Sequence, residues 1–351
     1  MLDYLIIGLG LAGISCCEQL EKHGKSYKVI SDTSQTSSMV AGGLYNPVIL
    51  KRFTLAWNAK EQLETAIPFY TNLEKKLGVK LNYPLPVRRR FASIEEQNLW
   101  FEAADKKGLS EFLSTNIHPN RNPSIDAPFG YGEVLGTGRI DTRALVSSYT
   151  TYLKEKDIFV ADTFDHSELQ IDENHIQYKS LKARKIIFAE GFGMKKNPFF
   201  KYLPMQGSKG EYLFVKAPDL KEKNAIKSSI FCIPEGNDVY RIGANYASED
   251  KTNAPTDAAR NELLKKWDAI VRCEYQVIGH VAGVRPTVSD RKPLAGQHPR
   301  HQNLYVLNGF GSRGVMTGPY VSEQLYRNIS NGNSLDAELD IARFTKKQFK
   351  T

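Results

Sequence analysis

Three glycines near the start of the chain have the spacing of a site that binds a dinucleotide. Gly8, Gly10 and Gly13 form a G-x-G-x-x-G loop, and Asp32 follows nineteen residues after Gly13. Gly8 allows a tight turn, Gly10 lets the backbone approach a pyrophosphate, and Gly13 lets a helix pack closely on a strand. Asp32 can accept hydrogen bonds from ribose hydroxyls, and an acid at this position argues against a 2′-phosphate.

The segments around this loop are those that such a site requires. Residues 3–7 form an apolar run without polar alternation, which is typical of a strand buried on both faces. Residues 14–23 have apolar side chains at helical spacing, and Leu11 and Ala12 lie where the helix N-terminus offers N–H groups to phosphates. Residues 27–30 predict a second strand. The motif fits NAD or FAD, and its position so early in the chain is more typical of flavoproteins.

The stretch that follows Asp32 suits a loop beside a large planar ligand and its phosphates. Thr33 and Ser38 belong to a run rich in hydroxyl side chains, and small residues follow at Ala41, Gly42 and Gly43 before Leu44. A flexible surface loop is a plausible alternative for the Ser/Thr run. It is a poor alternative for the segment of small residues.

Length and composition predict an ordinary globular protein with two domains. The chain has 351 residues, of which 41% are apolar and 25% charged. No apolar stretch is long enough to span a bilayer, and no basic segment precedes the first one, so we expect no membrane span, no signal peptide and a cytoplasmic location. The four cysteines have no metal-ligand or disulfide spacing, so we expect no metal site.

The net charge of +8 is compatible with anionic substrates or RNA, although the lysines are scattered along the chain. The order of the expected elements predicts an α/β fold in which a Rossmann-like nucleotide domain is interrupted twice by a mostly antiparallel β domain. We assign residues 1–80, 139–204 and 281–351 to the nucleotide domain and residues 81–138 and 205–280 to the β domain, which would hold the substrate.

Five stretches spread along the chain resemble the FAD-dependent D-amino-acid oxidase family, which includes glycine oxidase and sarcosine oxidase. They are residues 8–13 with Asp32, residues 38–44, residues 186–191, residues 283–286 with 290–296, and residues 309–315. The last stretch and residues 41–47 are also similar to the oxidoreductase domain of a bifunctional bacterial enzyme that modifies 2-thiouridine in tRNA. The methyltransferase domain of that enzyme has no counterpart in this sequence.

The resemblance implies a glutathione-reductase type of FAD domain with FAD bound in extended form. Besides the residues named above, it places these residues at the cofactor: Phe164, Ala189, Glu190, Gly191, Arg285, Gly309, Phe310, Gly311, Ser312, Arg313, Gly314, Val315 and Met316. Glu190 departs from the small residue that relatives have there. No cysteine near Arg285 corresponds to the covalent flavin link of sarcosine oxidase, so we expect non-covalent FAD.

The resemblance also implies the substrate site and the reaction. Arg285 stands where the family has an arginine that binds the substrate carboxylate, and a guanidinium can do so through two parallel hydrogen bonds. Arg313 would contact either the carboxylate or the cofactor, while Tyr240 and Tyr246 fall where the family has substrate-side groups. We expect oxidation of the C–N bond of a carboxylate-bearing amine by hydride transfer to flavin N5, with oxygen or another acceptor reoxidising the flavin.

Two other readings remain open at this point. One is removal of the carboxymethyl group from carboxymethylaminomethyl-uridine in tRNA, where Arg285 would bind the same carboxylate and basic residues would contact phosphates. The other is a non-catalytic flavin-binding protein.

Overall fold

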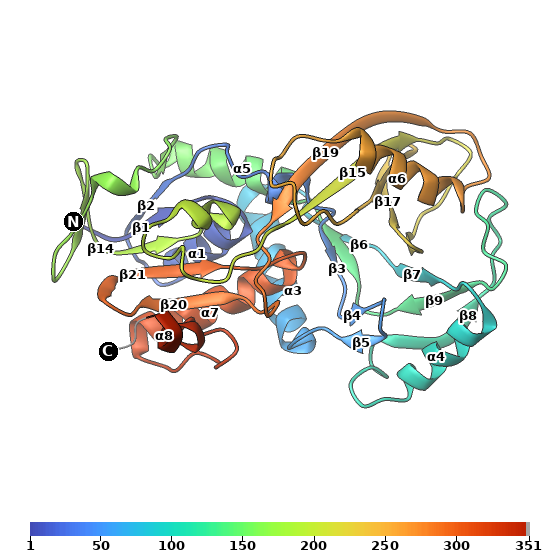
Figure 1. Cartoon of the computed structure of the whole chain (residues 1–351), viewed down its shortest axis with the longest axis horizontal. Coiled ribbons are helices and arrows are strands. Elements are labelled where there is room, and N and C mark those ends of the chain that lie inside the picture. The colour runs from blue at the N-terminus through green and yellow to red at the C-terminus, as the bar shows by residue number, and fades with distance from the viewer. Residues whose placement is uncertain (349–351) are drawn as a thin grey trace.

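The computed structural model describes residues 1–348 and contains two large β-sheets, which lie side by side along the long axis of the molecule (Figure 1). Helices pack on both sheets. They are α1 (Leu11–Lys22), α2 (Ser37–Val40), α3 (Ala59–Leu77), α4 (Ile94–Ala104), α5 (Thr142–Glu155), α6 (Asp257–Asp268), α7 (Gly314–Asn331) and α8 (Ala342–Gln348), with 3-10 turns at His166–Glu168 and Gly191–Lys196.

The first large sheet has a parallel centre, as expected for a Rossmann-like domain. Its parallel strands lie in the order β11 (Phe159–Val160), β2 (Tyr27–Ile30), β1 (Leu2–Ile7), β14 (Leu181–Phe188) and β21 (His301–Asn308). Antiparallel strands complete it: β12 (Leu169–Ile171), β13 (Ile176–Tyr178) and β20 (Leu294–His298). Strands from three separate parts of the chain therefore meet in one sheet.

The first strand is buried on both faces, which confirms the reading of its unalternating apolar run. Tyr4 and Ile6 belong to a core that also contains side chains of α1, α3, α5 and α7, whereas Leu5 and Ile7 belong to a second core with β14. Ile6 and Leu5 are both fully buried. Because successive side chains of a strand point to opposite faces, only a strand covered on both sides needs apolar residues at every position.

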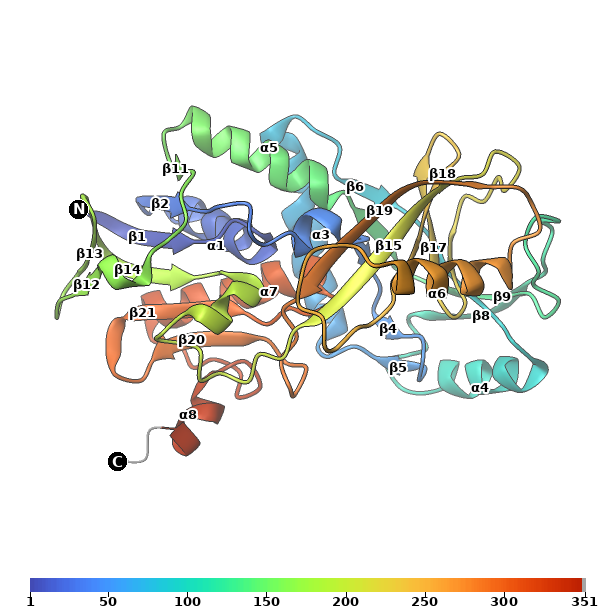
Figure 2. The same ribbon diagram turned by 45° about the horizontal axis from the view of Figure 1, so that its top comes forward.

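The second large sheet is mostly antiparallel. Its strands lie in the order β19 (Gln276–Arg285), β15 (Ser208–Lys216), β18 (Val239–Gly243), β17 (Phe231–Gly236), β16 (Ala225–Lys227), β7 (Val87–Arg90), β9 (Tyr131–Val134) and β8 (Leu113–His118). Within the described part of this second sheet, only β16 and β7 pair in parallel. In both views β15 and β19 run diagonally from the middle of the molecule into the half that holds this sheet (Figure 1, Figure 2).

Strand β19 continues through residue 281, where the sequence-based division between the two domains falls. We therefore propose that the division follows the sheets, with the boundary after β19 instead of within it. The last three residues of the predicted segment 281–351 lie outside the described residues.

Short strands join the two halves. β10 (Gly138–Ile140) pairs with β3 (Leu44–Tyr45) on one side and β6 (Asn82–Pro84) on the other, and β4 (Val48–Ile49) pairs with β5 (Thr54–Leu55). Helix α3 continues through Pro68, although a proline inside a helix removes one backbone hydrogen bond. Within residues 1–348 no helix combines the length and the apolar character that crossing a membrane requires.

Candidate active site

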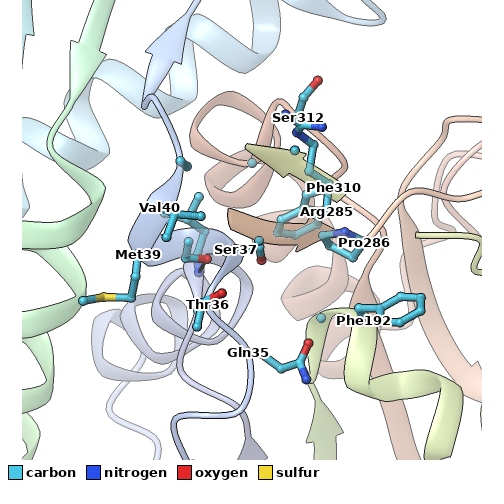
Figure 3. Close-up of a pocket in the computed structure, with 18 of the residues that line it drawn as sticks. Gln35, Thr36, Ser37, Met39, Val40, Phe192, Arg285, Pro286, Phe310 and Ser312 are labelled. Atoms are coloured by element: carbon cyan, nitrogen blue, oxygen red, sulfur yellow. Dashed lines mark hydrogen bonds between the residues drawn. The ribbon is translucent and has the colours of Figure 1, made fainter. Parts of the chain in front are cut away.

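A large cavity lies between the two sheets. It has a volume of about 1790 Å³ and is lined by the glycine loop, the segment after Asp32, the start of α7 and one face of the second large sheet. Figure 3 shows Thr36, Ser37 and Val40 on one side of it and Arg285 and Pro286 on the other.

Basic side chains outnumber acidic ones among the residues that line the cavity. The basic residues are Lys51, Arg143, Lys154, Lys195, Lys196, Lys227, Lys251, Lys266, Arg285 and Arg313, and the acidic residues are Asp32, Asp162, Glu190 and Glu262. Such an imbalance in a partly enclosed space attracts anions. The cavity is therefore suited to phosphates and carboxylates.

The glycine loop has no room for side chains. A Cβ at Gly8 would lie 2.5 Å from the carbonyl oxygen of Ala189, and one at Gly13 would lie 2.1 Å from the carbonyl oxygen of Gly8. Gly8 also has a φ of 96°, a conformation that glycine adopts at little cost. Helix α1 begins after Gly10, which has no side chain to cap it, and Leu11 N donates a hydrogen bond to Ser38 Oγ at 3.1 Å. The helix dipole still favours an anion at this end of the cavity.

Asp32 lies at the end of β2 with its carboxylate held in place. It accepts hydrogen bonds from Ser34 N at 2.9 Å and from Thr163 Oγ1 at 3.0 Å. Burial alone would raise the pKa of Asp32, but the hydrogen bonds from Ser34 and Thr163 outweigh it and lower the pKa. The side chain is therefore an anion at neutral pH and is suited to accept hydrogen bonds from ribose hydroxyls.

Glu190, which departs from the family pattern, is part of a local network. Its Oε1 lies 2.8 Å from His166 Nε2, and its Oε2 accepts a hydrogen bond from Asn197 Nδ2 at 2.7 Å. Glu190, His166 and Phe164 all line the cavity, and Phe164 stacks on Tyr178. These contacts fix the wall next to Asp32, where the adenosine half of a dinucleotide would lie.

The segment of small residues passes between the two halves of the molecule and is held there by a buried arginine. Gly43 has a φ of 70°, and a Cβ there would lie 1.9 Å from the carbonyl oxygen of Ile140. Arg241 donates hydrogen bonds to the carbonyl oxygens of Val40 and Ala41. Its Nε also donates to Glu235 Oε1 at 2.6 Å, and Glu235 pairs in addition with Arg139.

The start of α7 also faces the cavity. Phe310, Gly311, Ser312, Arg313, Gly314 and Val315 all line it. Arg313 is the residue before the helix and forms no side-chain cap. The helix N-terminus thus directs positive potential into the cavity, as the neighbouring N-terminus of α1 does.

Two guanidinium groups in the cavity have no acidic partner among the described residues. Arg285 makes only long contacts, from Nη1 to the carbonyl oxygens of Lys209 at 3.4 Å and Asn245 at 3.5 Å. Arg313 Nη1 is buried without a hydrogen-bond partner. Burial lowers the pKa of Arg313 below its usual range, and Tyr246 partly offsets that effect. An arginine nevertheless stays charged in proteins, so both groups can bind an anion.

Tyr246 lies over Arg285 and is near enough to Arg313 to affect its pKa. The Arg285 guanidinium lies 4.6 Å from the centre of the Tyr246 ring, and the Tyr246 side chain is mostly exposed. Arg285 also lies directly over the backbone of Gly210, where a Cβ would be only 1.8 Å from Arg285 Nη2. Arg285, Arg313 and Tyr246, which the sequence placed on the substrate side, thus lie together.

Four residues that the sequence assigned to the site are not among those that line the cavity. Tyr240 lies in the core between the second sheet and α6, and its hydroxyl accepts a hydrogen bond from Glu222 N. The assignment of Tyr240 to the substrate side is therefore corrected. Met316 is buried, and Gly13 and Gly309 pack against Gly8 and Val288 behind the cavity wall.

The sequence analysis missed Arg241, Tyr212 and Phe231. Tyr212 and Phe231 line the cavity, and Arg241 lies over the Tyr212 ring at 5.6 Å. One signal was present: in Val239–Gly243, residues 240 and 242 are apolar in character while position 241 between them is charged. That alternation indicates a strand with a polar role on one face.

Comparison with known proteins identifies the class that this fold and cavity define. A family model described as FAD dependent oxidoreductase (DAO) matches residues 3–327. The chain belongs to this family and is an FAD-dependent oxidoreductase. The fold is shared with the glycine oxidase from Geobacillus kaustophilus, with a TM-score of 0.79 and 16% identity over 100% of this chain and 99% of that chain.

Two curated relatives match this chain over only part of their own length. The chain is 25% identical to the tRNA 5-methylaminomethyl-2-thiouridine biosynthesis bifunctional protein MnmC of Legionella pneumophila (strain Corby), over 98% of this chain and 57% of that protein. It is 24% identical to the glycine oxidase of Bacillus subtilis (strain 168), over 55% of this chain and 56% of that protein. The chain thus spans little more than half the length of these relatives.

The residues present fit FAD. The two helix N-termini and the glycine loop suit the pyrophosphate, and Asp32 suits a ribose. A Cβ at Gly42 would lie 3.0 Å from Ile233 Cδ1 and 3.3 Å from the Tyr212 hydroxyl, so a side chain at this position would crowd the cavity wall. None of the cysteines in the described part of the chain lines the cavity.

Proposed function

We propose that the protein oxidises the C–N bond of a small amine that carries a carboxylate. The observation that supports this most is the pair of guanidinium groups, Arg285 and Arg313, in one cavity without acidic partners in the described part of the chain. A carboxylate bound there would satisfy the buried Nη1 of Arg313 and pair with Arg285. The names of the glycine oxidase relatives agree with such a substrate.

The mechanism assigns binding and orientation to this chain. When bound, FAD would supply the acceptor for the hydride that leaves the substrate Cα. Arg285 would grip the carboxylate and thereby fix which Cα–H faces the Ala41–Leu44 side of the cavity. Tyr246, lying over Arg285, would cover the carboxylate and limit its contact with water. The imine product hydrolyses in water, and oxygen or another acceptor would complete the cycle.

The test is the kinetics of Arg285→Ala with glycine, sarcosine, proline and D-amino acids as substrates. We expect KM to rise at least about tenfold, because a charge-assisted hydrogen bond contributes about 1.5–3 kcal/mol, with a smaller change in kcat. Gly210→Ala should act in the same direction without removing a charge, since its Cβ would displace the guanidinium. Arg121→Ala, at an exposed arginine outside the cavity, is the matched control.

Unchanged kinetics in both Arg285→Ala and Gly210→Ala would overturn the assignment. Failure of every amine to bleach the bound flavin without oxygen would instead point to a flavin-binding protein without this activity.

A second candidate is supported by the MnmC relatives and by the basic cavity. The substrate would be carboxymethylaminomethyl-uridine in tRNA, with Arg285 binding the carboxymethyl group. Salt-sensitive binding of tRNA in a gel would favour this candidate, and no binding at low salt would contradict it. The cytoplasmic location expected from the sequence stays a prediction under either candidate.

A further inference from the structure

A row of residues crosses the wall of the cavity on four neighbouring strands. Tyr212 on β15 lies opposite Gly243 on β18, which lies opposite Phe231 on β17, which lies opposite Lys227 on β16. All four line the cavity. Because directly opposite residues point to the same face of a sheet, two aromatic rings and one ammonium group follow one another along this wall.

The row leads far from the guanidinium of Arg285. Between Arg285 on β19 and Lys227 on β16 there are four steps from strand to strand, and four steps of about 4.8 Å make roughly 19 Å. The cavity, at about 1790 Å³, also has to hold FAD beside the glycine loop and the Ala41–Leu44 segment. A free amino acid at Arg285 would leave the distal part of the wall without a ligand.

Lys227 carries the one positive charge in its surroundings that no acid described in the structure compensates. Its Nζ donates a hydrogen bond to the carbonyl oxygen of Ser229 at 2.9 Å and lies 4.9 Å from the centre of the Phe231 ring. The two nearest cations are already paired: Arg89 of β7 with Glu96 of α4, and Lys266 with Glu262 on α6.

The same surroundings affect the charge of Lys227. Burial lowers the pKa of Lys227 to about 8, and the neighbouring cations Arg89 and Lys266 add to this effect. A bound anion would act in the opposite direction and favour the ammonium form.

We propose that the distal end of the cavity is a binding site for the phosphate of a nucleotide, held by Lys227, with the nucleotide's base against the rings of Phe231 and Tyr212. Aromatic faces accept any base by stacking, while a lysine binds phosphate as a point charge. This inference rests on the proposed oxidation and narrows its substrate to an amine carried by a nucleotide. The phosphate belongs either to a free nucleotide or to an RNA strand.

The test uses the protein with its FAD bound and a fluorescently labelled single-stranded RNA of five uridines, followed by anisotropy. We expect Lys227→Ala to weaken binding about tenfold and to reduce the slope of log K against log salt by about 0.7, the value for one phosphate contact on a single strand. Lys227→Arg should retain both. Lys223→Ala, at an exposed lysine near the same strand, is the matched control and should change neither.

The pH dependence distinguishes a contact of Lys227 from a structural effect. Raising the pH from 7 to 9 should weaken binding to the wild type about tenfold, because Lys227 then loses its proton, and should leave Lys227→Arg unaffected. If uridine monophosphate competes with the labelled RNA at an equal total concentration of phosphate groups, the ligand is a free nucleotide. If only RNA competes, the ligand is an RNA strand.

Wild-type affinity, salt slope and pH dependence in Lys227→Ala would overturn the proposal. Because anisotropy does not require turnover, this outcome is separate from a failure of the proposed oxidation, which is read from bleaching of the flavin by small amines in the wild type.

Discussion

At the scale of single residues, two groups can occupy their positions because the glycine beside each of them carries no side chain. Arg285 lies against Gly210, and Ala189 lies against Gly8. The sequence motif names the glycines of the loop, but Gly210 belongs to no motif. Its importance follows only from the structure, where β15 and β19 bring residue 210 under the guanidinium.

We expect Gly8→Ala to abolish FAD binding. The added Cβ would lie 2.5 Å from the carbonyl oxygen of Ala189, and the φ of 96° would strain the backbone as well. The measurement is the ratio of flavin absorbance to protein absorbance after purification and after addition of FAD. Gly24→Ala is the control, since Gly24 also has a positive φ of 63° but no atom within 4 Å of the added Cβ.

If the Gly24→Ala protein loses flavin to the same extent, the loss is due to general instability and not to the lack of space in the glycine loop.

At the scale of elements, a buried group of three charges connects the second large sheet to β10 and to the end of α2. Glu235 of β17 pairs with Arg241 of β18 and with Arg139 of β10, while Arg241 donates to the carbonyl oxygens of Val40 and Ala41 at the end of α2. The side chains of Arg139, Arg241 and Glu235 are at most 14% exposed. This group fixes the segment on which a flavin ring would lie.

Glu235→Ala should reduce the free energy of unfolding by about 3–5 kcal/mol, because it leaves two buried arginines without their carboxylate. Urea unfolding monitored by fluorescence measures this change, and the same variant should also bind FAD more weakly. Glu323→Ala removes an ion pair on the surface of α7 and is the control, with an expected loss of no more than about 0.5 kcal/mol. Equal losses in the two variants would contradict a structural role for the buried group.

The part of the fold that was predictable from sequence is the part that depends on neighbours along the chain. The glycine loop and the run from Phe310 to Val315 are local signals, and both line the cavity. Tyr240 and Tyr246 were indistinguishable in the sequence, because the register of β18 decides that Tyr240 faces α6 while Tyr246 follows the strand and reaches Arg285. Pairing between strands that are distant in sequence, as between β15 and β19, has no local signature.

At the scale of the whole molecule, FAD would contact segments from every part of the chain that contributes to the first sheet. A ligand that binds only the folded state stabilises it by RT ln(1 + [L]/Kd), which is about 2.7 kcal/mol at a hundredfold excess over Kd. We therefore expect the Tm of protein stripped of flavin to rise with the FAD concentration.

Acid precipitation of the protein as purified should release all of the flavin into the supernatant, as non-covalent binding requires.

Flavin that remains with the precipitate would contradict non-covalent binding. A Tm that does not respond to FAD would contradict binding to the folded state.

The order of the strands in the first sheet also determines when the cavity can form during synthesis. β1 comes from residues 2–7, but its partner β14 begins at residue 181 and β21 beyond it begins at residue 301. Pairings this distant in sequence fold slowly, because the intervening loop must be closed before any contact forms. The glycine loop therefore leaves the ribosome long before the α7 end of the cavity, and the nascent chain cannot retain its cofactor until nearly all of the described chain has been translated.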